Sequence, residues 1–252
     1  MHRSSKVTKS AKEIETLRVA GQILAKTHEI VGQMVESGVS LLELDSAAEE
    51  VIRGEGAVPS FKGYHGFPGT ICTALNNEVV HGIPDRRVLQ EGDIITIDSG
   101  ACWQGYHSDA ARTYIVGGDA KHPERAKFAK TMYVALMAGI DKAYAGNRVG
   151  DISAAIQSVI DASPYSLVQE YGGHGLGKGL HEEPFIPNYG KANSGIKLKA
   201  GMVLAIEPIV AMGSPNTQVL ADNWTVVTLD GSDAGQWEHF GVVRDDHFEI
   251  LC

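Results

Sequence analysis

Two segments near the N-terminus have the apolar spacing of amphipathic helices. In the first, apolar residues recur every three or four positions, at Ile14, Leu17, Ala20, Leu24 and Val31. Ser10 and Glu13 precede this stripe as a capping box, in which a hydroxyl and a carboxylate bind the free amides of the first turn. We therefore predict a helix that ends near Gly38, after a loose leader over residues 1–10.

The second capping box, Ser40 with Glu43, predicts a shorter helix that ends at about Gly54. Residues 58–117 then change to short β-rich runs broken by Gly and Pro, which is typical of strands joined by tight turns. Helical spacing returns over two further segments, about 123–145 and 151–162, before a Gly-rich, strand-like remainder.

One helix and one strand have counterparts further along the chain. An apolar stripe at positions i, i+3, i+4, i+7 and i+8 starts at Leu44 and again, 108 residues later, at Ile152. Residues 89–98 (LQEGDIITID) likewise match residues 198–207 (LKAGMVLAIE), and the two runs end in Asp98 and Glu207. Such a repeat predicts a single α/β (α+β) domain over residues 11–252, built from related halves at about 11–120 and 121–252. A pseudo-twofold axis between the halves would bring Asp98 and Glu207 together.

Composition narrows the possible functions. Lys and Arg total 22 against 31 for Asp and Glu, a net charge of −9, whereas nucleic acids and anionic membranes attract clustered positive charge. We therefore expect no nucleic-acid partner and no membrane partner. The start of the chain lacks the apolar core of a signal peptide, and Cys72, Cys102 and Cys252 fit neither a disulfide framework nor a CxxC metal site. We expect a soluble cytoplasmic protein with reduced thiols.

Four carboxylates have settings that suit metal ligands. Asp98 ends an apolar strand and Asp109 adjoins the next one, while Glu207 and Glu238 each border an apolar run without a nearby cation. A carboxylate in such a setting is costly unless it is paired or binds a metal. Each one alone could be a turn residue or a capped strand end; together they favour a metal site.

Histidines complete this set. The glycine-rich segment YGGHGLGKGLHEEP holds His174 and His181, and His81 lies at a turn after an apolar pair. Histidine is the commonest metal ligand, although an ordinary surface loop is the alternative here. Carboxylate-dominated ligation with one imidazole suits two divalent ions, and ions about 3.5–4 Å apart can hold a hydroxide and polarise a carbonyl. The residues thus indicate a dinuclear hydrolase and leave its substrate open.

These motifs together resemble the type I, bacterial-style methionine aminopeptidases from about residue 12 to the end. The resemblance rests on GYHGFPG, NNEVVHGIPD, GDIITIDSGA, YHSDAARTY, EYGGHGLGKGLHEEP, GMVLAIEP and QWEHFGVV. It implies the pita-bread fold, in which two pseudo-twofold-related halves share an antiparallel sheet covered by two helix pairs. It also implies that Asp98 binds one metal ion, that Asp109 and Glu238 bridge both, and that His174 and Glu207 bind the other.

The implied reaction removes the initiator Met from nascent polypeptides whose second residue is small. A hydroxide that bridges the metals attacks the Met carbonyl, and Glu207 carries a proton. His81 and His181 hydrogen-bond the scissile amide and the tetrahedral intermediate. The two divalent ions could be Co, Mn, Fe(II), Zn or Ni. The implied partners are the N-terminal peptide and, transiently, the ribosome, and the expected state is a monomer.

An apolar pocket for the Met side chain is also implied. Its matching positions are Tyr64, Phe67, Cys72, His81 and Trp224, with Phe61 and Leu180 at the edges. Phe67 stands where Tyr is common in the family, Phe61 where Cys often occurs and Leu180 where Phe is frequent. All three remain apolar, so the preference for Met should persist. Core packing is the alternative for Tyr64, Phe67 and Trp224.

Other functions on the same fold stay open at this stage. An Xaa-Pro aminopeptidase, a prolidase or a creatinase-like amidinohydrolase usually carries a separate N-terminal domain, for which 252 residues leave no space. A metal-free binding module typically lacks one or more ligands, whereas all five ligand positions are filled here. Both considerations favour the methionine aminopeptidase.

Overall fold

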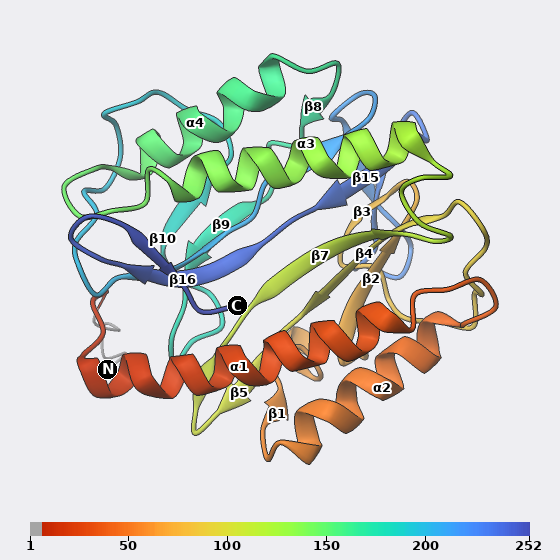
Figure 1. The fold of residues 1–252 in the computed structure, drawn as a ribbon, viewed down its shortest axis with the longest axis horizontal. Coiled ribbons are helices and arrows are strands. Elements are labelled where there is room, and N and C mark those ends of the chain that lie inside the picture. The colour runs from red at the N-terminus through yellow and green to blue at the C-terminus, as the bar shows by residue number, and fades with distance from the viewer. Residues whose placement is uncertain (1–6) are drawn as a thin grey trace.

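The computed structural model describes residues 7–252, which form four long helices around antiparallel strands. The helices are α1 (Ala11–Gln33), α2 (Leu41–Gly54), α3 (Pro123–Ile140) and α4 (Val149–Asp161). In Figure 1, α1 and α2 lie side by side along one edge of the molecule, α3 and α4 lie along the opposite edge, and the strands run between these pairs. The mixed α/β class predicted from the sequence is confirmed.

Both predicted capping boxes form. The Ser10 hydroxyl accepts a hydrogen bond from the Glu13 amide, and the Glu13 carboxylate accepts one from the Ser10 amide. Ser40 and Glu43 make the same two hydrogen bonds at the start of α2. Some predicted helix ends are wrong by several residues. The first helix ends at Gln33 rather than near Gly38, because the chain turns there and Gly38 adopts the left-handed φ of 101°.

The second helix pair also has shifted ends. Helix α3 stops at Ile140, short of the predicted 145, since the following residues form tight turns. Helix α4 begins at Val149, two residues earlier than predicted, because the Asp151 carboxylate accepts a bond from the Arg148 amide and caps the first turn.

Two sheets dominate the interior. The first has the order β2 (Ile71–Leu75), β4 (Ile94–Ser99), β7 (Ala110–Ile115). The second has the order β10 (Glu182–Pro187), β9 (Gly172–Gly175), β11 (Val203–Ile206), β16 (His239–Val243), β17 (Phe248–Ile250). All of these neighbours pair antiparallel.

Three small antiparallel sheets and one short helix complete the fold. Their strands are β1 (Val58–Pro59), β5 (Ala101–Trp103) and β6 (Tyr106–His107); β3 (Glu78–Val80), β13 (Thr217–Val219) and β14 (Val226–Thr228); and β8 (Ser166–Leu167), β12 (Ile209–Ala211) and β15 (Ala234–Gln236). A 3-10 turn, η1, spans Tyr64–Gly66.

The repeated strands occupy corresponding places. Strand β4, from the first repeat, is central in its sheet, and β11, from the second, is central in the other. Ile95 and Ile97 of β4 face a cluster beneath α1 and α2, whereas Ile94 joins the cluster beneath α3 and α4. The alternation of buried faces along β4 therefore lets one strand connect both helix layers. The boundary between the halves near residue 120 stays a prediction.

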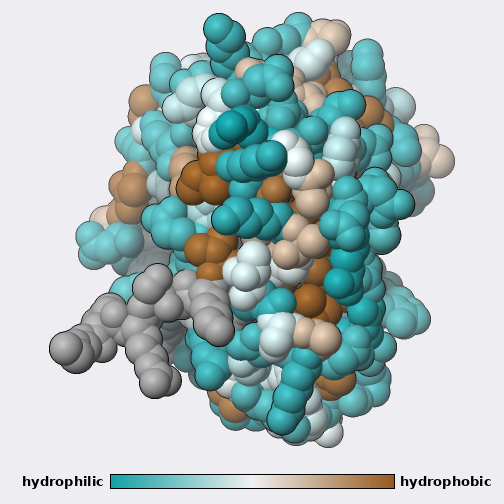
Figure 2. Space-filling model, turned by 90° about the vertical axis from the view of Figure 1, so that its left-hand side faces the viewer, coloured by the Kyte–Doolittle hydropathy of each residue, from teal (hydrophilic) through white to brown (hydrophobic). Residues whose placement is uncertain are grey.

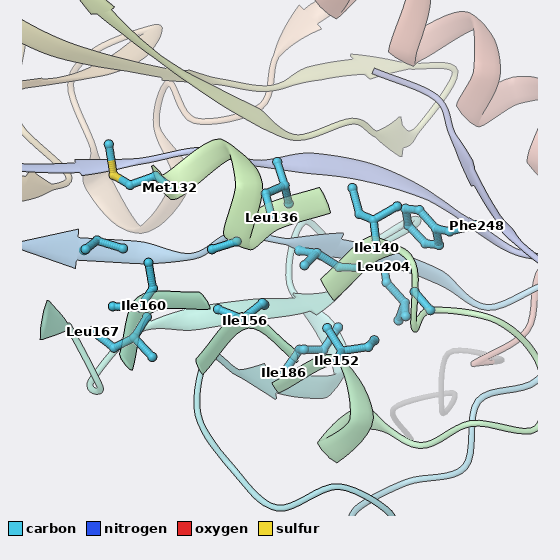
Figure 3. Packing of buried hydrophobic residues seen from close by; sticks show 14 of the residues in the cluster. Met132, Leu136, Ile140, Ile152, Ile156, Ile160, Leu167, Ile186, Leu204 and Phe248 are labelled. Carbon is cyan, nitrogen blue, oxygen red and sulfur yellow. The ribbon is translucent and has the colours of Figure 1, made fainter. Parts of the chain in front are cut away.

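The largest hydrophobic cluster lies beneath α3 and α4 (Figure 3). Ile152, Ile156 and Ile160 project from α4 toward Leu136 and Ile140 of α3 and the strands below. A Cβ at Gly139 would lie 2.8 Å from the side chain of Ile156, so Ile156 packs directly on the α3 backbone at this glycine. Dense packing of this kind makes the cluster sensitive to lost volume.

Residues 8 and 9, just before α1, pack against the rest of the protein. The prediction of a loose leader is therefore wrong for these two residues. Thr8 forms a β-bridge with Met202, and the Lys9 amide donates to the Gly201 carbonyl at 2.7 Å. The Lys9 ammonium bonds the Glu182 carboxylate at 2.5 Å with both side chains only 6% exposed. A desolvated ion pair holds this segment in place. Residues 1–6 of the predicted leader lie outside the described residues.

Among residues 7–252 no helix combines the length and the hydrophobicity needed to cross a bilayer. Cys72, Cys102 and Cys252 are free thiols, as their spacing predicted.

Replacing Ile156 by Ala tests the importance of the α3–α4 cluster. Ile156 is fully buried, so the lost contacts and the cavity should lower the free energy of unfolding by about 2–5 kcal/mol in urea denaturation. The matched control is Ile196→Ala on a side chain that is 49% exposed, and its effect should stay within about 0.5 kcal/mol. Equal losses from both variants would contradict this assignment of the core.

Candidate active site

A cavity of about 420 Å³ opens between the two halves. All the residues that the sequence predicts for the site line it: Phe61, Tyr64, Phe67, Cys72, His81, Asp98, Asp109, His174, Leu180, His181, Glu207, Trp224 and Glu238. The structure therefore brings every one of them together, from segments far apart in the chain. Their roles in catalysis and binding stay predictions.

Strand pairing in the first half places two of the carboxylates. Strands β4 and β7 are paired up to Ser99 and Ala110, so Asp98 near the end of β4 and Asp109 just before β7 become neighbours. Asp98 and Thr96 share one face of β4, opposite the face on which Ile97 packs beneath α1 and α2. The register thus turns Asp98 away from the helix layer and toward the cavity.

The second half repeats this arrangement. Strands β11 and β16 are paired up to Ile206 and His239, so Glu207 directly after β11 and Glu238 directly before β16 lie at the end of the ladder. His174 on β9 pairs with Ala205 on the other side of β11. Each half therefore supplies two carboxylates from the end of one antiparallel pair, and the second half adds the histidine.

The distances within the cluster suit metal coordination. His174 Nε2 lies 3.6 Å from Asp109 Oδ2 and 3.6 Å from Glu207 Oε1. Ligand atoms within 4.8 Å of one another occur in three groups of residues: Asp98, Asp109 and Glu238; His174, Glu207 and Glu238; and Asp109, His174 and His181. The first two groups share Glu238, and the third shows that His181 also comes within reach.

The metal-free cluster is electrostatically unfavourable. Burial raises the pKa of Asp98 to about 7 and, with the Asp98 charge, that of Glu207 to about 8. Burial and the neighbouring carboxylates also raise the pKa values of Asp109 and Glu238 well above the usual range. Among residues 7–252, no Lys or Arg forms an ion pair with these four groups.

A divalent cation fits this environment. Asp98 Oδ1 and Asp109 Oδ1 are buried without a hydrogen-bond partner, which is costly for carboxylate oxygens unless a cation occupies the space between them. Oxygen donors with one imidazole are a ligand set that divalent transition metals accept. The residues present therefore fit a metal centre.

Contacts behind the predicted ligands fix their orientation. His174 Nδ1 donates to the Gly175 carbonyl at 2.9 Å, which leaves Nε2 unprotonated and directed at the cluster. Burial lowers the pKa of His174 to about 4, so the ring is neutral. Gln236 donates its amide to Glu207 Oε2 at 3.0 Å.

Helix α1 fixes the carboxylates of the first half. The buried His28 donates from Nε2 to the Ala110 carbonyl at 2.9 Å, and Ser99 Oγ lies 3.0 Å from the same nitrogen. These contacts lie at the residues that directly follow Asp98 and Asp109. Burial lowers the pKa of His28 to about 3 and keeps this imidazole neutral.

The predicted Met pocket is an apolar cluster at one end of the cavity. Phe61, Phe67, Cys72 and Leu180 are buried there, with Tyr64, Ile83 and Trp224 packed against them. The rings of Phe67 and Trp224 meet edge to face with centroids 5.1 Å apart. Burial raises the pKa of the Cys72 thiol, so it forms part of the wall rather than a nucleophile.

His81 is held by an unusual backbone. Its φ of 59° is left-handed, a conformation that non-glycine residues adopt at an energetic cost. The next residue must be glycine, because a Cβ at Gly82 would lie 2.3 Å from the Thr73 carbonyl oxygen. Burial lowers the pKa of His81 to about 4, so the neutral ring can donate or accept one hydrogen bond.

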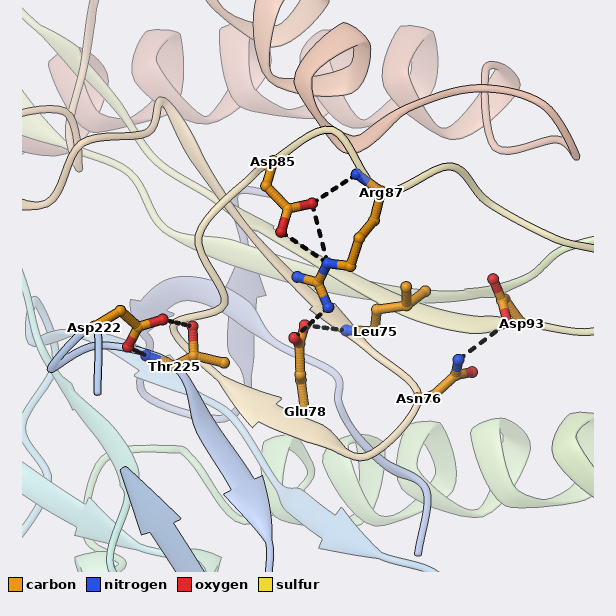
Figure 4. A network of polar contacts seen from close by, with 8 residues as sticks. All are labelled: Leu75, Asn76, Glu78, Asp85, Arg87, Asp93, Asp222 and Thr225. Carbon is orange, nitrogen blue, oxygen red and sulfur yellow. Dashed lines mark hydrogen bonds and ion pairs between the residues drawn. The ribbon is translucent and has the colours of Figure 1, made fainter. Parts of the chain in front are cut away.

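A polar network connects residues before and after this histidine in the sequence, from Leu75 to Arg87 (Figure 4). Glu78 accepts bonds from the Leu75 amide at 2.9 Å and from the Arg87 guanidinium at 2.5 Å, and Arg87 also bonds Asp85. On the neighbouring loop, Asp222 accepts bonds from the amides of Trp224 and Thr225. Residues outside the cavity thereby hold the strand that precedes His81 and the backbone of Trp224.

His181 lies at the mouth of the cavity. Its ring centroid is 4.3 Å from that of His174, and its Nδ1 shares a 2.9 Å hydrogen bond with the Tyr64 hydroxyl. Tyr64 thus connects the rim of the predicted Met pocket to His181, which lies beside the predicted metal ligands.

Some residues of the site were missed by sequence reasoning. Gln236 could have been found, because it lies two residues before Glu238 and strand alternation puts such residues on one face. His28 occupies an apolar position of α1, where only the interruption of the stripe by a polar residue signals it. Tyr171, whose ring lies 5.6 Å from that of His81, and Phe185 gave no signal of their own.

Four carboxylates and one histidine in an open cavity are a set of donor groups that suits a metal-dependent hydrolase. Comparison with known proteins agrees. The sequence model of metallopeptidase family M24 matches residues 15–245. Methionine aminopeptidase 1 of Bacillus subtilis is 47% identical over 97% of this chain and 98% of its own length.

Solved structures extend the comparison. The crystal structure of methionine aminopeptidase from Rickettsia prowazekii has a TM-score of 0.94 at 36% identity and covers 97% of this chain and 98% of its own. That from Thermotoga maritima has a TM-score of 0.93 at 38% identity, with the same coverage. The chain therefore belongs to metallopeptidase family M24, in its methionine aminopeptidase branch, and has the pita-bread fold that the resemblance implied.

The proline-directed alternative shares only the fold. Prolidase from Pyrococcus furiosus has a TM-score of 0.77 at 23% identity, and the match covers 97% of this chain but only 65% of that one.

The raised pKa values predict how pH affects the metal-free protein. Asp98 and Glu207 bind protons more tightly folded than unfolded, so they stabilise the fold fully below about pH 4, and this contribution disappears as the pH rises through 7–8. Asp98→Asn, which removes the charge and keeps the shape, should raise the free energy of unfolding at pH 8 by about 1–2 kcal/mol, or the Tm by roughly 2–8 °C.

Calorimetry with a chelator checks this expectation. The same variant should show a smaller gain at pH 5, because the folded Asp98 is still protonated there and only part of the contribution has been lost. An equal gain at both pH values would mean that the effect is not electrostatic.

Proposed function

We propose that the protein is a methionine aminopeptidase that removes the initiator Met from new polypeptides when the second residue is small. The observation that carries the proposal is the continuity of the cavity: an apolar pocket bounded by Phe67, Cys72 and Trp224 opens onto the carboxylate cluster. An apolar side chain in that pocket would bring its own carbonyl beside the ligand residues. The identity to methionine aminopeptidases over nearly the whole chain supports the same conclusion.

The centre is proposed to hold two divalent ions. Asp98 would serve one ion and His174 with Glu207 the other, with Asp109 and Glu238 between them, in agreement with overlapping groups of ligand atoms that share Glu238. Bound divalent ions polarise a carbonyl and lower the pKa of an attacking water. Co, Mn, Fe(II), Zn and Ni all suit these ligands, and cellular supply selects among them.

The other residues bind, orient and move protons. Glu207, which accepts a hydrogen bond from Gln236, is proposed to accept the proton of the attacking water and to pass it to the leaving amine. His81, neutral and fixed by the Gly82 turn, is proposed to hydrogen-bond the scissile amide. His181, oriented by Tyr64, would stabilise the oxygen that gains charge during attack.

Phe61, Phe67 and Leu180 differ from the residues common in the family but keep the pocket apolar. The preference for a Met side chain should therefore be retained. Buried aromatic walls favour a flexible, polarizable thioether, with which they make favourable sulfur–aromatic contacts. We further propose that the enzyme works as a monomer in the cytoplasm, where polypeptides are made, with transient contact to the ribosome.

A peptidase assay on metal-free protein tests the function. With Mn, Co, Fe(II) or Zn restored, Met-Ala-Ser should be cleaved, whereas Met-Leu-Ser and Ala-Pro should not. Asp109→Ala and Glu207→Ala should each lower kcat by at least about 10²-fold, because each removes a proposed metal ligand and so weakens the binding of the ions that activate the water. Cleavage of Ala-Pro instead would identify a proline-directed enzyme, and no cleavage with any metal would refute the proposal.

His81→Ala separates metal binding from catalysis. The imidazole is not among the grouped ligand atoms, so the affinity for Co(II), measured by calorimetry, should stay close to that of the wild type. The kcat for Met-Ala-Ser should fall by about 10²–10⁴-fold with the loss of its hydrogen bond. A variant with wild-type kcat would remove His81 from the mechanism.

A further inference from the structure

A second hollow, of about 200 Å³, lies beside the active-site cavity. It is formed by the start of α4 and by the chain that leaves β10, and its lining includes Phe185, Pro187, Tyr189 and Ile196. Phe185 also lines the active-site cavity, so one side chain forms a wall of both. Phe185 on β10 therefore lies between the two hollows.

The largest side chains around this second hollow are apolar and exposed, while glycines and serines form much of the rest. Phe185 is 53% exposed, Ile196 49% and Tyr189 39%, although large apolar side chains are stabilised by burial. On the side of the molecule where the loop between β10 and β11 lies, brown apolar side chains form small separate groups among teal polar ones (Figure 2). Small groups of this kind suit a short extended chain better than a globular partner, which needs a larger continuous patch.

The strand register connects this hollow to the reaction centre. Phe185 pairs with the proposed ligand His174, and β10 is the outermost strand of its sheet. Two residues further along β10, Pro187 lies about 7 Å away at the usual rise of a strand. A peptide whose scissile bond lies at the cluster would thus pass Phe185 and reach the hollow with its third to fifth residues after that bond.

We propose that this hollow binds apolar side chains of the substrate polypeptide at the third to fifth positions after the scissile bond. The inference rests on the proposed function, since it places the remainder of the same substrate. Pro184 and Pro187 carry no N–H, so the outer edge of β10 offers a peptide few donors. Recognition therefore depends on apolar side chains and tolerates many sequences.

Peptides of matched length test the proposal. Met-Ala-Ser-Leu-Leu-Ser and Met-Ala-Ser-Ser-Ser-Ser differ only in the residues that would reach the hollow. The wild type should cleave the first with a kcat/KM about 3–10-fold higher, through a lower KM, because an open hollow buries only part of each Leu. Met-Ala-Ser serves as the reference, since it ends before the hollow.

Two variants locate the effect. Ile196→Ser and Tyr189→Ser alter the second hollow alone, so each should reduce the preference to less than about 2-fold while the turnover of Met-Ala-Ser stays as in the wild type. Leu229→Ser, at another exposed apolar residue, is the matched control and should keep the preference.

The outcomes separate this inference from the function on which it rests. Equal rates for the two hexapeptides, or a preference that survives both variants, would overturn the inference while cleavage of Met-Ala-Ser upholds the function. Failure of the wild type to cleave Met-Ala-Ser with any metal would overturn the function itself.

Discussion

The structure around the active site depends on the repulsion between four buried carboxylates. These groups, which would carry like charges in one interior space, are Asp98, Asp109, Glu207 and Glu238. Without a cation, burial raises the pKa values of all four, so the cluster holds protons that a metal would displace. The fold must force these groups together against that repulsion. It does so with rigid strand ladders, whose ends cannot separate without breaking backbone hydrogen bonds.

The same device is used twice. Each half ends a central antiparallel pair at two carboxylates, and each half covers its sheet with two helices whose apolar faces are well buried. Hydrophobic burial in the helix layers offsets the unfavourable free energy of bringing the carboxylates together. Helix α1 extends this support, because His28 bonds the backbone next to the carboxylates of the first half.

Local chemistry explains which features the sequence could predict. The helix starts were predicted correctly because each capping pair lies within one turn, Ser10 with Glu13 and Ser40 with Glu43. The end of α1 was not, because it depends on the turn before Gly38, which hydrophobic periodicity does not indicate. The repeat of Asp98 and Glu207 predicted that two strands from different halves would meet at one site. The register of those strands could only be seen in the folded chain.

Residues that act through tertiary contacts were invisible to such reasoning. The sequence around Phe185 is typical of any strand, and only the fold shows that β10 lies at the edge of its sheet. Lys9 belongs to a polar segment of the sequence, and only the fold shows its ion pair with Glu182. The Met pocket was predicted through family resemblance, because nothing in the spacing of Phe67, Cys72 and Trp224 indicates that they share a wall.

The buried pair between Lys9 and Glu182 has a practical consequence for handling the protein. Glu182 directly follows His181 and also accepts a bond from the Gly179 amide at 2.9 Å, so the segment before α1 supports the loop that carries this histidine. Purification tags, surface immobilisation or proteolytic trimming that strain the chain near Lys9 would therefore reach the mouth of the active site.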